Sequence, residues 1–201
     1  MLIIFIGKNL IYEGGDPMPK IIENIEQKIF NAVVVLIRKH GYSAVNMRMI
    51  AKESGIAVGT LYNYYSDKED LTTTVVYLSW KETLKNLEKI LDNALTPREK
   101  LHLFLERLYG EISQRRGIGS ELMKHDLYKD KKFIEVQVTY TRIFRRLLHE
   151  LEKGEGKSYE ESYVKRIQKN IMQITINLVN EFIDEDQENI KYLKKVADQL
   201  L

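Results

Sequence analysis

Apolar residues recur at intervals of three and four along the chain from Lys20 onward. This spacing puts them on one face of an α-helix, and no stretch there shows the sustained two-residue alternation of a half-buried strand. The pattern predicts an all-α fold of about nine helices. With 201 residues, the chain is long enough to bury a core as one large domain or as two small ones.

Composition removes several classes of function. The sequence contains no cysteine, which excludes disulfides, thiolate nucleophiles and cysteine metal sites and fits a reducing, cytoplasmic location. The net charge of +2 is too small to indicate a nucleic-acid partner without a motif. The apolar run from Leu2 to Ile6 is far shorter than the roughly 20 residues that cross a bilayer, so we expect no signal peptide and no membrane partner.

The N-terminal stretch raises a question about the gene. Glu13 to Asp16 can be encoded by bases that have the form of a bacterial ribosome-binding site, and Met18 follows shortly after. We therefore hypothesise that translation begins at Met18 and that residues 1–17 are upstream sequence. The alternative is a genuine, loosely held N-terminal extension. The intact mass of the protein made from its native gene distinguishes the two.

Capping residues and glycines mark the expected helix ends. Gly55 permits the left-handed conformation that ends a helix, while Thr96 with Glu99 and Ser158 with Glu161 have the spacing of capping boxes. We expect helices over residues 19–40, 47–54, 58–64, 67–93, 97–116, 120–128, 131–152, 159–183 and 187–200, with a flexible connector at 153–157.

The segment from Asn46 to Leu71 carries the most specific pattern in the chain. Ala51 is small enough for two helices to cross at a steep angle, and Gly55 supplies the turn between them. Four apolar residues would lock the pair together: Ile50, Ile56, Leu61 and Tyr65. Over about residues 20–72 the sequence resembles the DNA-binding signature of the tetracycline-repressor (TetR) family.

The resemblance implies a helix-turn-helix domain over residues 18–66 and a domain for effector binding and dimerisation over residues 67–201. It implies a ligand-responsive regulator, expected to be a repressor, that binds a palindromic operator as a homodimer and is released by a small, largely hydrophobic effector. No cofactor is expected. Release from the operator would be a population shift caused by the effector. The helix expected over residues 67–93 joins Lys68, at the operator, to Trp80, at the presumed cavity. A tilt of this helix would change the separation of the two recognition helices.

The second helix of such a unit enters the major groove of DNA. The family implies a phosphate contact for the Tyr62 hydroxyl, and the Asn63 amide is the best candidate for pairing with adenine. Lys68 is a cation in the first turn of its helix, where the helix dipole disfavours positive charge. A DNA phosphate would offset this unfavourable interaction. The neighbouring acidic residues could offset it instead. The full set of expected DNA contacts is Asn46, Arg48, Val58, Gly59, Thr60, Tyr62, Asn63, Tyr64 and Lys68. A helix cap for Asn46 and a plain surface charge for Arg48 are the alternative roles.

The sequence departs from the family pattern at three positions. Ala57 stands where a serine cap is usual, which is expected to cost the recognition helix about 1 kcal/mol. Tyr64 and Tyr65 replace a more usual histidine and phenylalanine. These changes keep the motif but leave the operator sequence open.

Aromatic and apolar residues of the middle helices are candidates for an effector cavity. They are Tyr77, Trp80, Leu84, Phe104, Leu108, Met123, Phe133, Gln137, Tyr140, Phe144 and Met172. For any one of these residues, a place in the plain core is the more common role. Gln137 is distinctive because it falls within the inward stripe between Phe133 and Tyr140, where it would bond a neighbour or a ligand; an edge position in solvent is the alternative.

The helix expected at 159–183 is apolar over so wide an arc that it must be covered from two sides. A second subunit is the economical source of that cover. The expected dimer interface comprises Ile171, Met172, Ile176, Val179, Ile183, Leu193 and Leu200.

Other classes of function fit less well. No histidine pair and no His-Glu-x-x-His or Gly-x-Ser-x-Gly motif occurs, so we expect neither a metal site nor an enzyme. A helical ligand-binding protein that no longer reads DNA, and an activator with the same fold, are the remaining alternatives.

Overall fold

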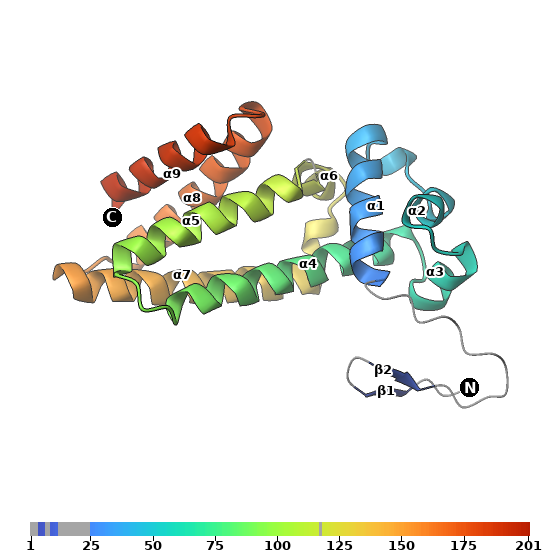
Figure 1. The fold of residues 1–201 in the computed structure, drawn as a ribbon, viewed down its shortest axis with the longest axis horizontal. Helices are drawn as coiled ribbons and strands as arrows, with labels where there is room; N and C mark the ends of the chain where they lie inside the picture. The colour runs from blue at the N-terminus through green and yellow to red at the C-terminus, as the bar shows by residue number, and fades with distance from the viewer. Residues whose placement is uncertain (1–3, 7–8, 12–24, 117) are drawn as a thin grey trace.

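The computed structural model describes residues 4–6, 9–11, 25–116 and 118–201. The molecule is elongated, with α1–α3 at one end and long helices extending away from them (Figure 1). The elements in chain order are β1 (Ile4–Ile6), β2 (Asn9–Ile11), α1 (Ile25–His40), η1 (Tyr42–Ala44), α2 (Met47–Ser54), α3 (Val58–Tyr64), α4 (Lys68–Leu91), α5 (Pro97–Gln114), α6 (Ile118–Lys124), η2 (Leu127–Lys129), α7 (Lys131–Glu155), α8 (Glu161–Glu181) and α9 (Asp186–Leu200).

The expected all-α class is confirmed. A short antiparallel hairpin of β1 and β2, with Ile4 opposite Ile11, was not predicted. The remainder of the expected 1–17 extension and the proposed start at Met18 lie outside the described residues.

The helices α1, α2 and α3 pack around a small apolar core that includes Val33, Ile50 and Leu61, all fully buried. The same cluster also contains Leu71 from α4 and Phe133 from α7. The expected boundary at residue 66 therefore runs through one continuous core, because later parts of the chain complete the N-terminal unit.

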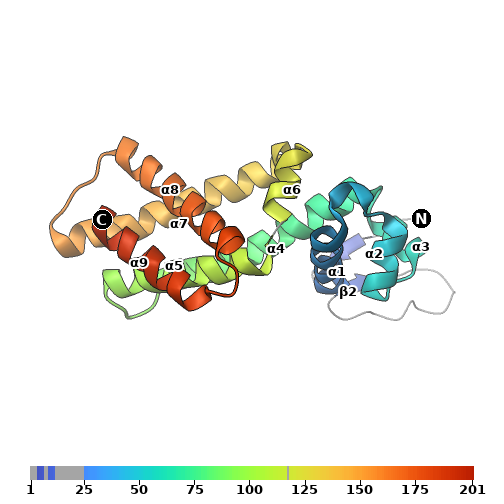
Figure 2. The same ribbon diagram turned by 90° about the horizontal axis from the view of Figure 1, so that it is seen from above.

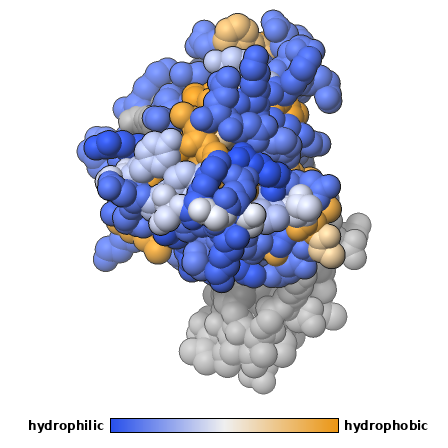
Figure 3. All heavy atoms as spheres, turned by 90° about the vertical axis from the view of Figure 1, so that its left-hand side faces the viewer, coloured by the Kyte–Doolittle hydropathy of each residue, from blue (hydrophilic) through white to orange (hydrophobic). Residues whose placement is uncertain are grey.

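The long helices α4, α5 and α7 lie side by side, and α8 and α9 cover α5 (Figures 1 and 2). Their core is centred on the fully buried side chains of Phe104, Leu108 and Phe144. The surface at the end remote from α1–α3 is mainly hydrophilic, with apolar side chains in separate patches (Figure 3). In the described ranges we find no helix with the length and apolar character needed to cross a membrane.

Two sequence expectations about the connection between α7 and α8 are wrong. The predicted capping box at Ser158 is absent, because α8 begins only at Glu161. The backbone N–H of Tyr159 instead donates to a Glu152 carboxylate oxygen at 2.9 Å, which holds this segment off the helical path. In addition, α7 continues through the expected connector until Gly156, whose φ of 64° ends the helix.

A buried polar network joins the two cores. The Arg115 guanidinium, 7% exposed, donates to Glu111 Oε2 at 3.1 Å and to Thr83 Oγ1 at 2.7 Å. The central carbon of the guanidinium, Cζ, lies 4.8 Å from the centre of the Trp80 ring and 5.7 Å from the centre of the Phe30 ring. Arg115 thus connects α5 to α4 and reaches α1 of the N-terminal unit.

Candidate nucleic-acid interface

Local capping interactions build the α2–turn–α3 unit. The Asn46 side chain accepts a hydrogen bond from the backbone N–H of Met49 at 3.1 Å, and Gly55 ends α2 with φ of 69°. Ile56 is then buried against the pair. The structural role of Asn46 as a helix cap is therefore observed, and its phosphate contact stays a prediction.

The expected recognition residues of α3 are exposed, except for the half-buried Thr60. Leu61 and Tyr65 are buried, whereas Tyr62 is 55% exposed. Val58, Gly59, Asn63 and Tyr64 are also exposed, Thr60 is half-buried, and Arg48 projects into solvent from α2. Ala57 is the N-cap residue of α3 and makes no side-chain hydrogen bond there, as expected for a residue without a polar side chain.

Gly59 is not required by the packing of the chain itself. A Cβ atom built at this position meets no heavy atom within 4 Å, and the backbone is not in the left-handed region. A bare, exposed backbone in the first turn of α3 suits close approach of another molecule.

Lys68 has a partner that sequence reasoning missed. Its ammonium donates to the backbone carbonyl of Tyr42 at 2.9 Å and lies 4.1 Å from the centre of the Tyr42 ring. Burial lowers the pKa of the Lys68 ammonium. These contacts account for a cation in the first turn of α4 without DNA, and they use one of its three N–H donors.

The segment around Tyr42 also contacts α6 and the residue that follows it. The backbone N–H of Tyr42 donates to Glu121 Oε2 at 2.8 Å, and the His125 ring centre lies 4.8 Å from that of Tyr42. Nothing in the sequence indicates this pairing, because the residues are far apart along the chain and belong to no shared motif.

An exposed helix that projects from a tightly capped helix-turn-helix is the arrangement of a DNA-binding protein. Residues 29–74 match the family described as bacterial regulatory proteins of the tetR family. This stretch of the chain is therefore similar to the DNA-binding domain of tetR-family regulators.

The fatty acid metabolism regulator of Bacillus subtilis is 27% identical over 135 residues, which cover 65% of this chain and 70% of the relative. Two further curated repressors are matched over less than half of their length.

Among solved structures, the fatty acid degradation regulator FadR of Bacillus halodurans has a TM-score of 0.74 at 24% identity, covering 90% of this chain and 97% of that one. FadR of Bacillus subtilis in complex with stearoyl-CoA has a TM-score of 0.67 at 21% identity, covering 87% and 96%. These structures share the fold.

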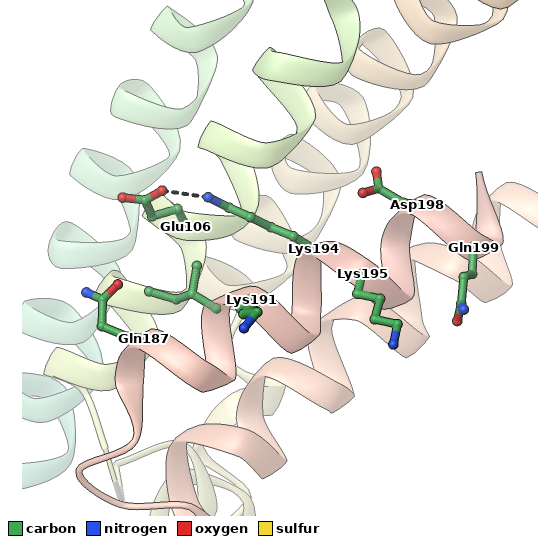
Figure 4. Close-up of a pocket in the computed structure, with 8 residues that line it drawn as sticks. Glu106, Gln187, Lys191, Lys194, Lys195, Asp198 and Gln199 are labelled. Atoms are coloured by element: carbon green, nitrogen blue, oxygen red, sulfur yellow. Dashed lines mark hydrogen bonds and ion pairs between the residues drawn. The ribbon is translucent and has the colours of Figure 1, made fainter.

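The expected cavity residues fall into different surroundings. Phe104, Leu108, Tyr140 and Phe144 pack together in the larger core with Leu84, while Phe133 belongs to the N-terminal core. Tyr77, Trp80 and Met172 are half-buried, and the side chain of Met123 lies outside the described residues. A pocket of about 500 Å³ on α9 is lined by none of them. Charged side chains surround it, among them Lys194 and Glu106, which lie 2.9 Å apart (Figure 4).

Gln137 does not face inward. It is exposed on α7, which corrects the expectation of a buried polar group and supports the alternative of an edge position. One turn further along α7, Gln168 Nε2 of α8 donates to Thr141 Oγ1 at 2.8 Å.

The expected dimer residues divide in two. Ile171, Val179 and Leu193 are fully buried in the core of their own chain, so they have no surface to offer a second copy. The expected interface took residues from both apolar stripes of α8, whereas α5 and α9 of the same chain pack against this helix. Met172, Ile176 and Leu200 are half-buried, and Ile183 is 53% exposed.

Proposed function

We propose that this protein is a cytoplasmic transcriptional repressor that binds a palindromic operator as a homodimer and leaves it when a small, largely hydrophobic effector binds between the middle helices. The observation that carries the DNA-binding part is the exposure of the α3 face, with Tyr62, Asn63 and the bare backbone of Gly59 presented together. Effector binding is supported by the aromatic core of α5 and α7 and by the stearoyl-CoA complex of a protein with the same fold.

Dimerisation is supported by apolar side chains that a single chain leaves in solvent. Phe182 and Ile183, at the end of α8, are 50% and 53% exposed. Large neighbouring apolar side chains in solvent are typical of an interaction surface. A dimer would also place two α3 helices so that each reads one half-site about one helical turn from the other.

The test is selection of bound sequences from random duplex DNA by the full chain, followed by titration of the selected site. We expect a palindromic consensus, an affinity that falls steeply with salt and a complex of two chains per duplex. Binding with no sequence preference would contradict the proposal.

The Tyr62→Phe variant removes only the hydroxyl expected to contact phosphate. We expect weaker binding to all sequences by a few-fold to about tenfold, because one hydrogen bond to a charged group is lost. Tyr192→Phe is the matched control, since Tyr192 is 54% exposed and lies on α9, at the other end of the molecule from α3 (Figure 1). Equal affinities for both variants would contradict the assigned role of Tyr62.

A further inference from the structure

The segment η1, which joins α1 to α2, is bonded to two helices outside the helix-turn-helix. The Tyr42 carbonyl accepts from Lys68 of α4 at 2.9 Å, and the Tyr42 N–H donates to Glu121 of α6 at 2.8 Å. In a third contact, Ser43 Oγ lies 3.2 Å from Nε2 of His125, the residue that follows α6. Both polar groups of the Tyr42 backbone therefore connect η1 to later helices.

The backbone conformation of Gly41 makes the bond to Glu121 possible. Its φ of 74° lies in the left-handed region, where a residue with a side chain would be strained. The N–H of Gly41 still donates to the Ile37 carbonyl of α1 at 2.8 Å, whereas the next N–H, that of Tyr42, donates to α6. A special backbone conformation thus occurs at the residue directly before the contact with α6.

The position of η1 determines the position of the recognition helix α3. Val45 follows η1 directly and is buried, and Asn46 then caps α2. The helices α2 and α3 share the fully buried Ile50 and Leu61, so they move with η1 as one closely packed body. Apolar packing against α4 and α6 is not directional, whereas hydrogen bonds have a narrow range of distances and angles. The bonds of η1 therefore restrict the angle of the DNA-binding unit.

The angle of the DNA-binding unit matters for the spacing of an operator. A dimer binds two half-sites whose separation matches that of its recognition helices. One additional base pair moves the half-sites about 3.4 Å further apart and turns them by about 35° relative to each other. A unit that is held at one angle cannot follow this rotation, whereas a loosely held unit can.

We propose that Glu121 is a positioning residue for operator choice. Through its bond to the Tyr42 N–H, it restricts the protein to one distance between operator half-sites. The side chains of α3 select the sequence of each half-site, and the contact between η1 and α6 selects the spacing. This inference rests on the proposed function and adds a second determinant of the operator.

The test compares operators that differ only in spacing. The palindrome selected by the full chain is lengthened or shortened by one base pair at its centre, and the affinity for each duplex is measured for the original chain and for Glu121→Ala. We expect the original chain to lose about tenfold or more in affinity at the wrong spacing and Glu121→Ala to lose only a few-fold. Both proteins should select the same half-site sequence. Equal losses for the two proteins would overturn the proposal.

The ratio of two affinities separates positioning from stability. A variant that is partly unfolded has less active protein, but this lowers the apparent affinity for both spacings equally and cancels in the ratio. Circular dichroism at the temperature of the titration confirms that each variant is folded.

Two further variants test the hydrogen bond itself. Glu121→Gln loses the ion pair with the exposed Lys124 but keeps an oxygen that can accept from the Tyr42 N–H, so it should retain the strict spacing. His125→Ala removes the neighbouring contact with Ser43 and should relax the spacing to a smaller extent than Glu121→Ala. A Glu121→Gln variant as tolerant of spacing as Glu121→Ala would contradict the role of this bond.

Glu88→Ala is the matched control. It also removes a carboxylate that joins two helices, since Glu88 of α4 pairs with Arg142 of α7 at 2.7 Å, but it lies outside the contact between η1 and α6. Its spacing preference should equal that of the original chain.

The outcomes separate this inference from the proposed function. If the chain binds a specific palindrome but Glu121→Ala keeps the strict spacing, the inference fails and the function stands. If the chain selects no specific sequence, the proposed function itself fails.

Discussion

The backbone N–H of Tyr42 donates a hydrogen bond of 2.8 Å to the Glu121 carboxylate, joining the segment between α1 and α2 to α6. The carbonyl of the same residue accepts from Lys68 at the start of α4, at 2.9 Å. One residue of the DNA-binding unit is thus bonded to both α4 and α6. These two bonds couple the position of that unit to both helices.

Removing the carboxylate should therefore affect stability and DNA binding together. Glu121→Ala leaves the Tyr42 N–H without its partner, and we expect a loss of about 1–3 kcal/mol in the free energy of unfolding. Operator affinity should fall as well. Urea denaturation and DNA titration measure the two effects. Glu181→Ala, at an exposed position at the end of α8, is the control and should change neither the unfolding free energy nor the operator affinity. If Glu121→Ala behaves like this control, the hydrogen bond between Tyr42 and Glu121 contributes nothing.

Gly59→Ala should separate stability from DNA binding. The new methyl group meets open space, and alanine is favoured over glycine in a helix by up to about 1 kcal/mol, so the melting temperature should rise or stay constant. On DNA the same methyl group occupies the surface of closest approach, and affinity should drop.

Gly110→Ala is the matched control for this change. Its Cβ also meets open space, but it lies in α5, so it should preserve operator affinity. Equal operator affinities for the two alanine variants would argue against close approach of DNA at Gly59.

The buried Arg115–Glu111 pair should be much more sensitive than an exposed pair. Arg115→Met leaves Glu111 partly buried without its cation, and we expect a loss of about 3–5 kcal/mol. The double variant with Glu111→Gln should recover part of it. Arg142→Met breaks an exposed pair with Glu88 and should cost far less, because solvent screens that pair. Similar losses for the two single variants, measured by urea denaturation, would refute this ranking.

Acid should loosen the junction of α7 and α8. The pKa of Glu152 is lowered chiefly by the hydrogen bond that its carboxylate accepts from the Tyr159 N–H. Hydrogen bonds from Arg145 and His149 lower it further. A carboxyl whose pKa is depressed in the folded state stabilises the protein above the unfolded value of about 4.3, and this contribution is lost as pH falls through the lower folded value.

The pH dependence of the unfolding free energy tests this assignment. Glu152→Gln should flatten its slope below about pH 4.5 relative to the original chain. An unchanged slope would remove Glu152 as a contributor.

The proposed dimer should depend on the apolar end of α8. Ile183→Lys introduces a charge at a position that is 53% exposed in the single chain, so it should leave folding intact and shift the oligomeric state toward monomer in sedimentation. Val35→Lys, at a 48% exposed position on α1, is the control and should remain dimeric. A dimeric Ile183→Lys variant would place the interface on another surface.

Local patterns determined most of the helices and the DNA-binding motif from sequence alone, with the α7–α8 connection as the exception. The Asn46 cap, the Gly55 turn and the Thr96–Glu99 capping box are all observed, because such signals act over a few residues and their geometry follows from the backbone. The outward face of α3 followed in the same way from the spacing of Leu61 and Tyr65.

Only the tertiary structure decided which surfaces are covered. Periodicity marks a helix face as apolar, but whether the chain itself or another molecule covers it depends on where distant helices cross; hence Ile171 is core, while Gln137 is exposed. The bonds of Tyr42 with Glu121 and Lys68 likewise depend on the folded path of the chain. Contacts between residues far apart in sequence leave no local pattern, because neither residue constrains its own neighbours.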